Sequence, residues 1–106
     1  MPRAKFQTLT EQMFYILLCL KEECCGMDIM DRVPAMTDGR VQVGSGTLYN
    51  LLEQFCDADM IEETKSEGRR RSYILTAKGR EALAKEYDRL TQQAADYRRA
   101  FLEGAD

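Results

Sequence analysis

The stretch VGSGTLYNLLEQFCDADMI, residues 43–61, decides the fold of this chain. Its apolar residues recur at the spacing of one helix face, which is formed by Leu48, Leu51, Leu52 and Phe55. This periodicity predicts a helix of about three turns that begins near Thr47 and buries that face. Gly44 or Ser45 is a suitable N-cap, because a short residue there leaves the first-turn N–H groups accessible to an oxygen acceptor.

Polar side chains gather at the predicted start of this helix. They are the hydroxyls and the amide of Ser45, Thr47, Tyr49 and Asn50. Together with the free N–H groups of the first turn, they form a helix end that suits a phosphate group or the edge of a base. An ordinary amphipathic helix with a polar first turn has the same pattern, so the neighbouring sequence must decide between the two interpretations.

The composition limits what the chain can do. With 106 residues it forms one small domain with a modest core, and its formal net charge of −3 gives no overall attraction for nucleic acid. Any nucleic-acid surface must therefore be local. The chain has no histidine, which removes the usual general base and the commonest metal ligand. We therefore expect a protein that is not an enzyme, with no catalytic residues, no metal site and no cofactor.

The four cysteines, Cys19, Cys24, Cys25 and Cys56, include no CxxC pair that would predict a zinc site. The N-terminus has no secretory signal and no apolar run is long enough to cross a membrane. We therefore expect reduced thiols in a cytoplasmic protein without a membrane partner. A redox sensor at Cys24 and Cys25 stays open as an alternative. An enzyme would need a cysteine nucleophile that is activated without histidine.

Two helices are predicted before the central stretch. Thr8 and Glu11 match a capping box, so the first helix is expected to begin at Thr8. It is expected to end near residues 24–26, where Gly26 can adopt the left-handed conformation of a helix C-terminus. A second, shorter helix is predicted over residues 27–36, with Pro34 kinking it or ending it early.

Residues 40–43 alternate polar and apolar side chains, which predicts a brief strand before the central helix. Helix, helix, short strand and helix within about 50 residues is the outline of a helix-turn-helix unit. The last helix of such a unit faces outward, which would place the polar helix start at residues 45–50 on the surface.

A β-hairpin is predicted after the central helix. Residues 60–65 and 71–75 are strand-like runs, joined by a polar loop that contains Gly68. Six basic residues and a single acid lie within residues 65–80. The hairpin tip carries Arg69, Arg70 and Arg71. The guanidinium group is the preferred partner of phosphate, while a charged edge strand that only resists aggregation is the alternative.

One long helix is predicted from Thr76, as its N-cap, to about Glu103. Its apolar residues alternate spacings of four and three, the 3.5-residue repeat of a helix that packs along another helix. They are Leu83, Tyr87, Leu90, Ala94, Tyr97 and Phe101. The opposite face is expected to carry Lys85, Glu86, Arg89, Gln93, Asp96 and Arg99. We predict a homodimer through the apolar stripe, and a helix that packs back on its own domain is the alternative.

Three parts of the chain together resemble the PadR family of bacterial transcriptional regulators, in its short form with one C-terminal helix. They are residues 16–29, the run GTLYNLL at residues 46–52 with Met60 and Ile61, and most specifically the run GRRRSYILTAKGR at residues 68–80. The similarity covers about residues 9–90. It implies a winged helix-turn-helix dimer that binds operator DNA, usually as a repressor released by a small molecule.

The resemblance and the residue pattern assign the same roles. The four polar residues between Ser45 and Asn50 are expected to approach the major groove and its flanking phosphates. The arginine triplet of the hairpin is expected to contact the DNA backbone or the adjacent minor groove. The family often has a basic residue where this chain has Glu53 or Gln54, so the recognition helix here carries acids and no lysine or arginine.

The effector is not identified by the resemblance. Drug-sensing members of the family stack planar cationic compounds on an aromatic residue at the dimer interface. The matching position in this chain is Leu90, with Tyr87 one turn earlier, and the chain has no tryptophan.

These observations predict a mainly α fold with a small β-hairpin. A winged helix-turn-helix DNA-binding domain is expected at residues 1–75 and a dimerisation helix at residues 76–106. The expected function is a sequence-specific, DNA-binding transcriptional regulator, a homodimeric repressor relieved by a small-molecule effector. The alternative is a winged-helix protein-interaction module in which Glu53, Asp57 and Asp59 prevent DNA binding.

Overall fold

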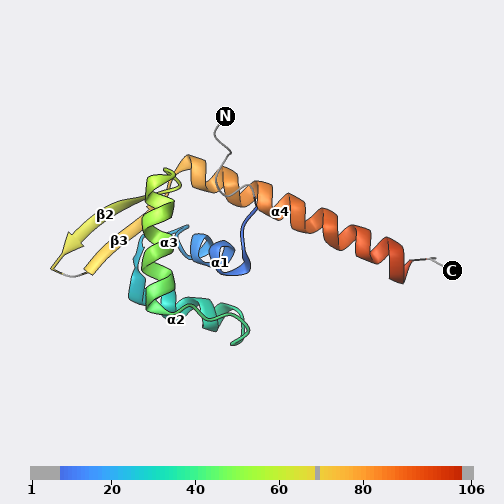
Figure 1. The fold of residues 1–106 in the computed structure, drawn as a ribbon, viewed down its shortest axis with the longest axis horizontal. Coiled ribbons are helices and arrows are strands. Elements are labelled where there is room, and N and C mark those ends of the chain that lie inside the picture. Colours follow the sequence, from blue (N-terminus) through green and yellow to red (C-terminus); the bar gives the residue numbers. More distant parts are fainter. Residues whose placement is uncertain (1–7, 69, 104–106) are drawn as a thin grey trace.

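The computed structural model describes residues 8–68 and 70–103. Its elements follow one another as α1 (Glu11–Cys19), β1 (Cys24–Cys25), α2 (Gly26–Met36), α3 (Ser45–Asp57), β2 (Ile61–Glu67), β3 (Arg70–Leu75), α4 (Ala77–Tyr97) and a π-helical turn (Arg98–Leu102). Figure 1 shows α1, α2, α3 and the hairpin gathered into one body, from which α4 extends. The mainly helical fold with a small hairpin agrees with the prediction from the sequence.

The core lies where α1, α2 and α3 meet one another and the sheet. Its fully buried apolar side chains are Ile16, Leu17, Leu20, Ile29, Val33, Leu48, Leu52 and Phe55. Burying each of these side chains contributes about 1.5–3 kcal/mol relative to leaving it in water, which is the main force that assembles the three helices. The predicted buried face of α3 is confirmed.

The sheet is antiparallel, with strand order β1-β3-β2. The β2–β3 hairpin runs from Ile61 opposite Leu75 to a turn at Gly68, whose φ of +61° lies in the left-handed region that favours glycine. The predicted hairpin is confirmed, with both strands longer than expected. The two-residue strand β1 was not predicted; it pairs Cys24 with Tyr73 on the other edge of β3.

The first helix begins two residues later than predicted. Thr10, not Thr8, is the N-cap, and its hydroxyl oxygen accepts from the Met13 N–H at 3.2 Å. The reason lies in Leu9, whose side chain is buried and whose backbone N–H donates to the Glu86 carboxylate of α4 at 3.2 Å. Because the Leu9 N–H is bound to α4, Leu9 lies outside the helix, which begins after Thr10.

The predicted end of the first helix near Gly26 is also wrong. The helix ends at Cys19, because the chain then turns to place Cys24 and Cys25 beside β3. Gly26 is instead the first residue of α2, in a place where a larger residue does not fit: a Cβ atom there would lie 2.5 Å from the Tyr49 hydroxyl oxygen.

Of the two effects predicted for Pro34, an early end of α2 is not found, and the predicted range to residue 36 is confirmed. The helix continues to Met36, and the Thr37 N–H still donates to the Val33 carbonyl at 3.1 Å. A proline costs one backbone hydrogen bond inside a helix. Here the last turn is held in place by the fully buried Val33 side chain and by the hydrogen bond from the Thr37 N–H to the Val33 carbonyl.

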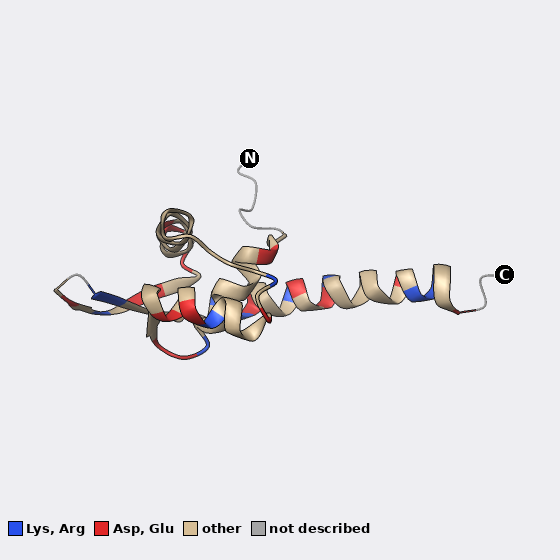
Figure 2. Cartoon of the chain, turned by 90° about the horizontal axis from the view of Figure 1, so that it is seen from below, with Lys and Arg blue, Asp and Glu red and all other residues tan. Residues whose placement is uncertain are grey.

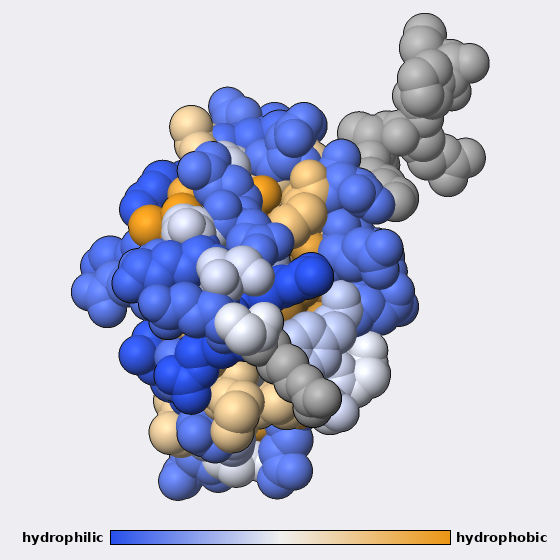
Figure 3. Space-filling view, turned by 90° about the vertical axis from the view of Figure 1, so that its left-hand side faces the viewer, coloured by the Kyte–Doolittle hydropathy of each residue, from blue (hydrophilic) through white to orange (hydrophobic). Residues whose placement is uncertain are grey.

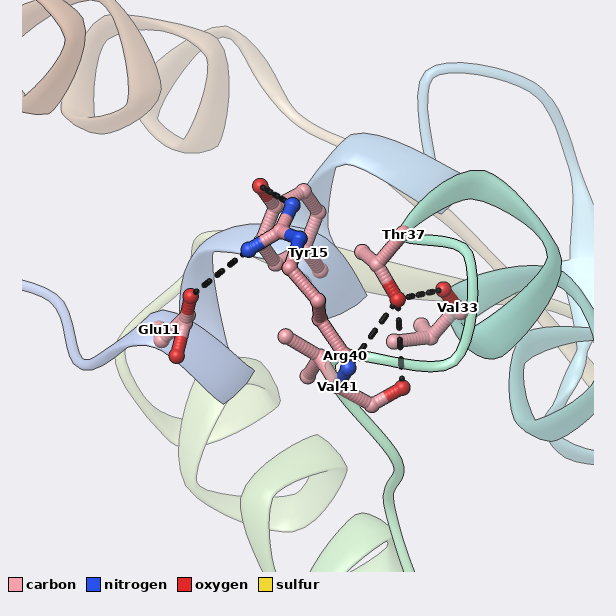
Figure 4. Close-up of polar contacts among 6 residues, drawn as sticks. All are labelled: Glu11, Tyr15, Val33, Thr37, Arg40 and Val41. Atoms are coloured by element: carbon pink, nitrogen blue, oxygen red, sulfur yellow. Dashed lines mark hydrogen bonds and ion pairs between the residues drawn. The ribbon is translucent and has the colours of Figure 1, made fainter.

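Thr37 organises the loop between α2 and α3 (Figure 4). Its buried hydroxyl donates to the Val33 carbonyl at 2.8 Å and accepts from the Val41 N–H at 3.0 Å. The strand predicted at residues 40–43 is therefore wrong, since its backbone bonds to this local network instead of to a neighbouring strand. The alternation itself is real: Val41 and Val43 are buried and the residue between them is exposed.

Side chains from this loop and from α1 also tie the loop down. The Arg40 guanidinium lies 3.5 Å from both the Glu11 carboxylate and the Tyr15 hydroxyl (Figure 4). The Gln12 side-chain amide donates to the Gln42 carbonyl at 2.9 Å. These contacts fix the segment that leads directly into the start of α3.

The join between the hairpin and α4 is tightly packed. Thr76 is the N-cap of α4 as predicted, with its hydroxyl oxygen accepting from the Gly79 N–H at 3.1 Å. Gly79 itself lies against the chain before β2, because a Cβ atom at this position would come within 2.0 Å of the Met60 carbonyl oxygen. Only glycine allows α4 to lie this close to the backbone at residue 60.

Glu86 faces the domain, whereas the sequence pattern placed it with Arg89 on the opposite, solvent side of α4. Its side chain is 3% exposed, accepts from the Leu9 N–H and pairs with Arg89, which is itself half-buried. The Arg89 hydrogen bond, followed by that of Leu9, lowers the pKa of the Glu86 carboxyl. A charged group can lie at this junction because both its partners stabilise the ionised form.

We predict that Gly79→Ala destabilises the fold by about 2–3 kcal/mol, because the added methyl group overlaps a backbone oxygen that cannot move freely. Thermal or urea unfolding measures this. Gly46→Ala is the matched control, since a Cβ atom in that helical position meets nothing within 4 Å. The control is expected to change the free energy of unfolding by less than about 1 kcal/mol. Equal effects of the two substitutions would contradict the close packing at Gly79.

We predict that Glu86→Gln lowers the free energy of unfolding by about 1 kcal/mol at neutral pH. Because the pKa of Glu86 is lowered in the folded state, its stabilising effect is present above the ordinary glutamate pKa of about 4.3 and is lost as the pH falls through the lowered value. Urea unfolding of both proteins between pH 7 and pH 3 should show the difference shrinking. The exposed Glu81→Gln is the control, and a difference that stays constant with pH would contradict the assignment.

Candidate nucleic-acid interface

Helix α3 presents its polar start to solvent. Ser45, Thr47, Tyr49 and Asn50 are all exposed, whereas the other side of the helix is in the core. The N-cap is Gly44, which has no side chain to bind the first-turn N–H groups. These N–H groups and the side chains around them are therefore available to an external acceptor such as phosphate.

The β2–β3 hairpin, called the wing below, places basic residues beside α3, since Arg70 and Arg71 line hollows together with Tyr49. Arg70 and Arg71 are exposed on β3, and Figure 2 shows this blue segment near the hairpin tip. Arg69, which the sequence assigned to the same tip, lies outside the described residues. Helix α3 itself contains no lysine or arginine, so the positive charge of this surface comes from the wing.

A groove separates α3 from the wing. It has a volume of about 460 Å³ and is lined by Tyr49, Glu53, Arg71 and Tyr73. A second hollow of about 270 Å³ adjoins it, since Tyr49 and Arg71 border both; it reaches past Arg70 to Gly26 at the start of α2. The structure thus brings Tyr49, Arg70 and Arg71 together, while Ser45, Thr47 and Asn50 lie outside these hollows.

Tyr49 links three elements. Its hydroxyl end rests against Gly26 at the start of α2, its ring borders the groove, and 47% of its surface is still exposed. The absence of a side chain at Gly26 makes this position possible. Tyr49 is therefore a structural contact as well as an exposed side chain at the candidate interface.

Two residues of the groove were not assigned to the interface from the sequence pattern. Tyr73 lies on β3 opposite the α3 side of the groove; burial raises its pKa, and the nearby Arg71 opposes that rise. Glu53 lies on α3 one turn after Tyr49. Its position on the exposed helix face is a sequence signal for the interface. Its negative charge argued against that assignment, because an acid is unexpected where phosphate is the partner.

Three of the four cysteines have thiols whose pKa is raised by burial. Burial raises the pKa of Cys24 to about 11, and it also raises the pKa of Cys19 and of Cys56. A protonated thiol is a poor nucleophile, which argues against a sensor at Cys24. The buried Cys25 thiol lies 3.3 Å from the Asp28 carboxylate, whose pKa is lowered mainly by the Cys25 N–H. The described residues contain no cluster of three or more potential metal ligands.

The predicted stripe on α4 is largely exposed. Tyr87 is 63% exposed, Tyr97 58% and Phe101 72%, and the rings of Tyr97 and Phe101 lie 5.2 Å apart between centroids. Leu90 and Ala94 are exposed as well, and Leu102 adds a residue that the pattern did not include. Leu83 differs, because it is half-buried and packs against the core of its own domain.

The end of the molecule that carries the wing is mostly hydrophilic, as the space-filling view in Figure 3 shows, with small hydrophobic patches between polar side chains. The exposed apolar residues of α4 lie instead along the helix that extends away from this end (Figure 1). The two candidate surfaces are therefore separate and differ in chemistry.

A helix-turn-helix unit whose last helix is exposed beside a β-hairpin defines a winged helix-turn-helix protein. Residues 16–85 match the transcriptional regulator PadR-like family, and the chain belongs to this family. The members of this family are transcriptional regulators and not enzymes, in agreement with the expectation from the sequence. No curated protein matches the chain in sequence.

Solved structures share the fold. A transcriptional regulator from Clostridium thermocellum has a TM-score of 0.68 at 18% identity and covers 88% of this chain and 93% of its own. RosR from H. salinarum has a TM-score of 0.65 at 21% identity, covering 92% and 100%. A PadR-like transcription factor from Bacteroides fragilis has a TM-score of 0.68 at 26% identity, covering 81% and 85%. Among the described residues, no helix is long and apolar enough to span a membrane.

Proposed function

We propose that this PadR-like regulator is a homodimeric, sequence-specific DNA-binding repressor that acts in the cytoplasm and is relieved by a small-molecule effector. In this proposal residues 1–75 bind DNA and residues 76–106 form the dimer. The observation that carries it is that Tyr49, in the open polar start of α3, lines one surface with the wing arginines Arg70 and Arg71. A double helix can receive the end of a helix in its major groove while a flanking basic hairpin contacts its phosphate backbone.

The residues divide into two roles in this proposal. Phosphates are bound by the first-turn N–H groups of α3, by Ser45 and Thr47, and by the wing arginines Arg69, Arg70 and Arg71. Tyr49 and Asn50 approach base edges in the major groove. The protein is acidic overall, so the phosphate contacts must come from this local charge and not from the field of the whole molecule.

The exposed stripe of α4 supports the dimer. Leu90, Tyr97 and Phe101 expose 40%, 58% and 72% of their surface, an unfavourable arrangement for a helix that stays alone in water. A second α4 that packs along the same stripe would cover them and relate the two DNA-binding domains by a two-fold axis.

A pocket beside this stripe supports the effector. It has a volume of about 300 Å³, lies between the start of α1 and the middle of α4, and is lined by Phe14, Tyr15 and Leu90 together with the polar pair Glu86 and Arg89. Apolar and aromatic walls with a few polar groups are typical of small-molecule sites. Its walls include α1, which also holds the loop before α3.

We predict that replacing Arg70 and Arg71 with Ala weakens binding to every DNA sequence. Fluorescence anisotropy with the DNA upstream of the protein's own coding region, and with an unrelated fragment, measures this at several salt concentrations. Loss of two phosphate contacts should reduce the slope of log K against log salt concentration by about 2. Lys85→Ala with Arg99→Ala removes the same charge from α4 and from the π-helical turn that follows it, and is the matched control.

Wild-type protein should prefer the upstream fragment and lose affinity for both fragments as salt rises. Unchanged binding by the wing variant would contradict the assignment of the wing arginines. Absence of binding by the wild type, even at low salt, would contradict the proposed function and favour the protein-interaction module with acids at Glu53, Asp57 and Asp59.

We predict that Leu90→Glu and Tyr97→Glu convert a dimer into a monomer, because each places a charge in the apolar stripe. Sedimentation equilibrium measures the mass directly. Gln92→Glu is the control, since Gln92 is exposed and, at about 100° per residue, lies about 160° around α4 from Leu90 and 140° from Tyr97. A Tyr97→Glu protein that remains dimeric would show that the stripe is not the interface.

A further inference from the structure

The exposed face of the recognition helix α3 carries two charged side chains, Glu53 and Asp57, and Glu53 is the one that lines the groove beside the wing. Glu53 is two residues from Leu51 and two from Phe55, so it points about 160° away from each of these buried side chains around the helix. Gly46, seven residues earlier, lies within about 20° of the same direction. A ligand that approaches the exposed side of α3 therefore meets bare backbone at Gly46, and the Glu53 side chain two turns later, after Tyr49 and Asn50.

The Glu53 carboxylate is free to bind an external group. It is exposed and lines the groove between α3 and the wing, together with Tyr49, Arg71 and Tyr73. Within residues 8–68 and 70–103 it makes no hydrogen bond and no ion pair. Nothing in the described fold therefore accounts for an acid at this position.

A carboxylate can only accept hydrogen bonds, and it is repelled by phosphate, so its favourable partner on DNA is a donor on a base edge. The major groove offers two such donors, the amino groups of cytosine and adenine. Adenine presents its N7 acceptor beside that amino group, which repels a carboxylate, whereas cytosine presents the donor without an adjacent acceptor of its own.

We propose that Glu53 determines sequence specificity by accepting a hydrogen bond from the amino group of a cytosine at one position of each half-site. This inference rests on the proposed function, since it assumes that α3 enters the major groove. Arg71 on the other side of the groove offsets part of the phosphate repulsion that the carboxylate meets. An acid in the recognition helix lowers the affinity for DNA of any sequence. In this proposal that loss accompanies the gain in selectivity for cytosine.

The experiment is selection of duplexes from a randomised DNA library by wild-type protein, Glu53→Ala, Glu53→Gln and Asp57→Asn, followed by anisotropy on the selected sites. Wild type is expected to prefer cytosine at one position of each half-site by about tenfold. Glu53→Ala should lose that preference and keep the others. Glu53→Gln should shift it to adenine, because glutamine pairs with the N6 and N7 atoms of adenine.

Asp57→Asn is the matched control, because it removes one negative charge from the last turn of α3, outside the groove lining. It should leave the preferred sequence unchanged. A uniform gain in affinity for all sequences, equal in the Glu53 and Asp57 variants, would overturn the proposal and show that the acid only opposes DNA binding. An unaltered cytosine preference in Glu53→Ala would overturn it as well.

Failure of the proposed function would look different. Wild-type protein that enriches no sequence and binds no duplex at low salt would overturn the DNA-binding assignment, and the role of Glu53 with it. Circular dichroism of each variant confirms the fold, which the exposed positions of both residues should preserve.

Discussion

The burial of one face of α3 is the constraint on which the rest of the structure depends. Leu48, Leu52 and Phe55 are almost completely inaccessible, and they lie in one core cluster with Ile16 and Leu17 of α1. A helix held this way cannot rotate without exposing large apolar surface. The direction of its opposite face is therefore fixed, and so are the side chains that any ligand on that side will meet.

The charge distribution follows from this arrangement and not from the net charge. An acidic chain can bind a polyanion only if its basic groups are separated from its carboxylates. Here the register of the hairpin places Arg71 on the groove side of β3, while α3 supplies hydroxyls and a free helix start. Glu53 is the acid that lines this groove. In the proposed function, a charge that opposes nonspecific affinity would be explained by a contact that only some sequences can provide.

The sequence predicted the elements whose signals are local. The periodicity of α3, the hairpin and the Thr76 cap all depend on residues that are close together in the sequence. Two of the errors came from long-range contacts: Leu9 binds Glu86, and Gly26 makes room for Tyr49 instead of ending a helix. The groove was also beyond a local analysis, because its residues come from separate elements that only the folded core brings together.

The connection between the two candidate surfaces is stiff. Helix α4 is fixed at its start by the approach of Gly79 to Met60, and about two turns further along by the hydrogen bond of Glu86 to Leu9, just before α1. The half of α4 that extends beyond these anchors carries the exposed stripe. In the proposed dimer, the packing angle of the two α4 helices would therefore set the separation of the two α3 helices, so that any ligand altering that angle would change the fit to both half-sites at once.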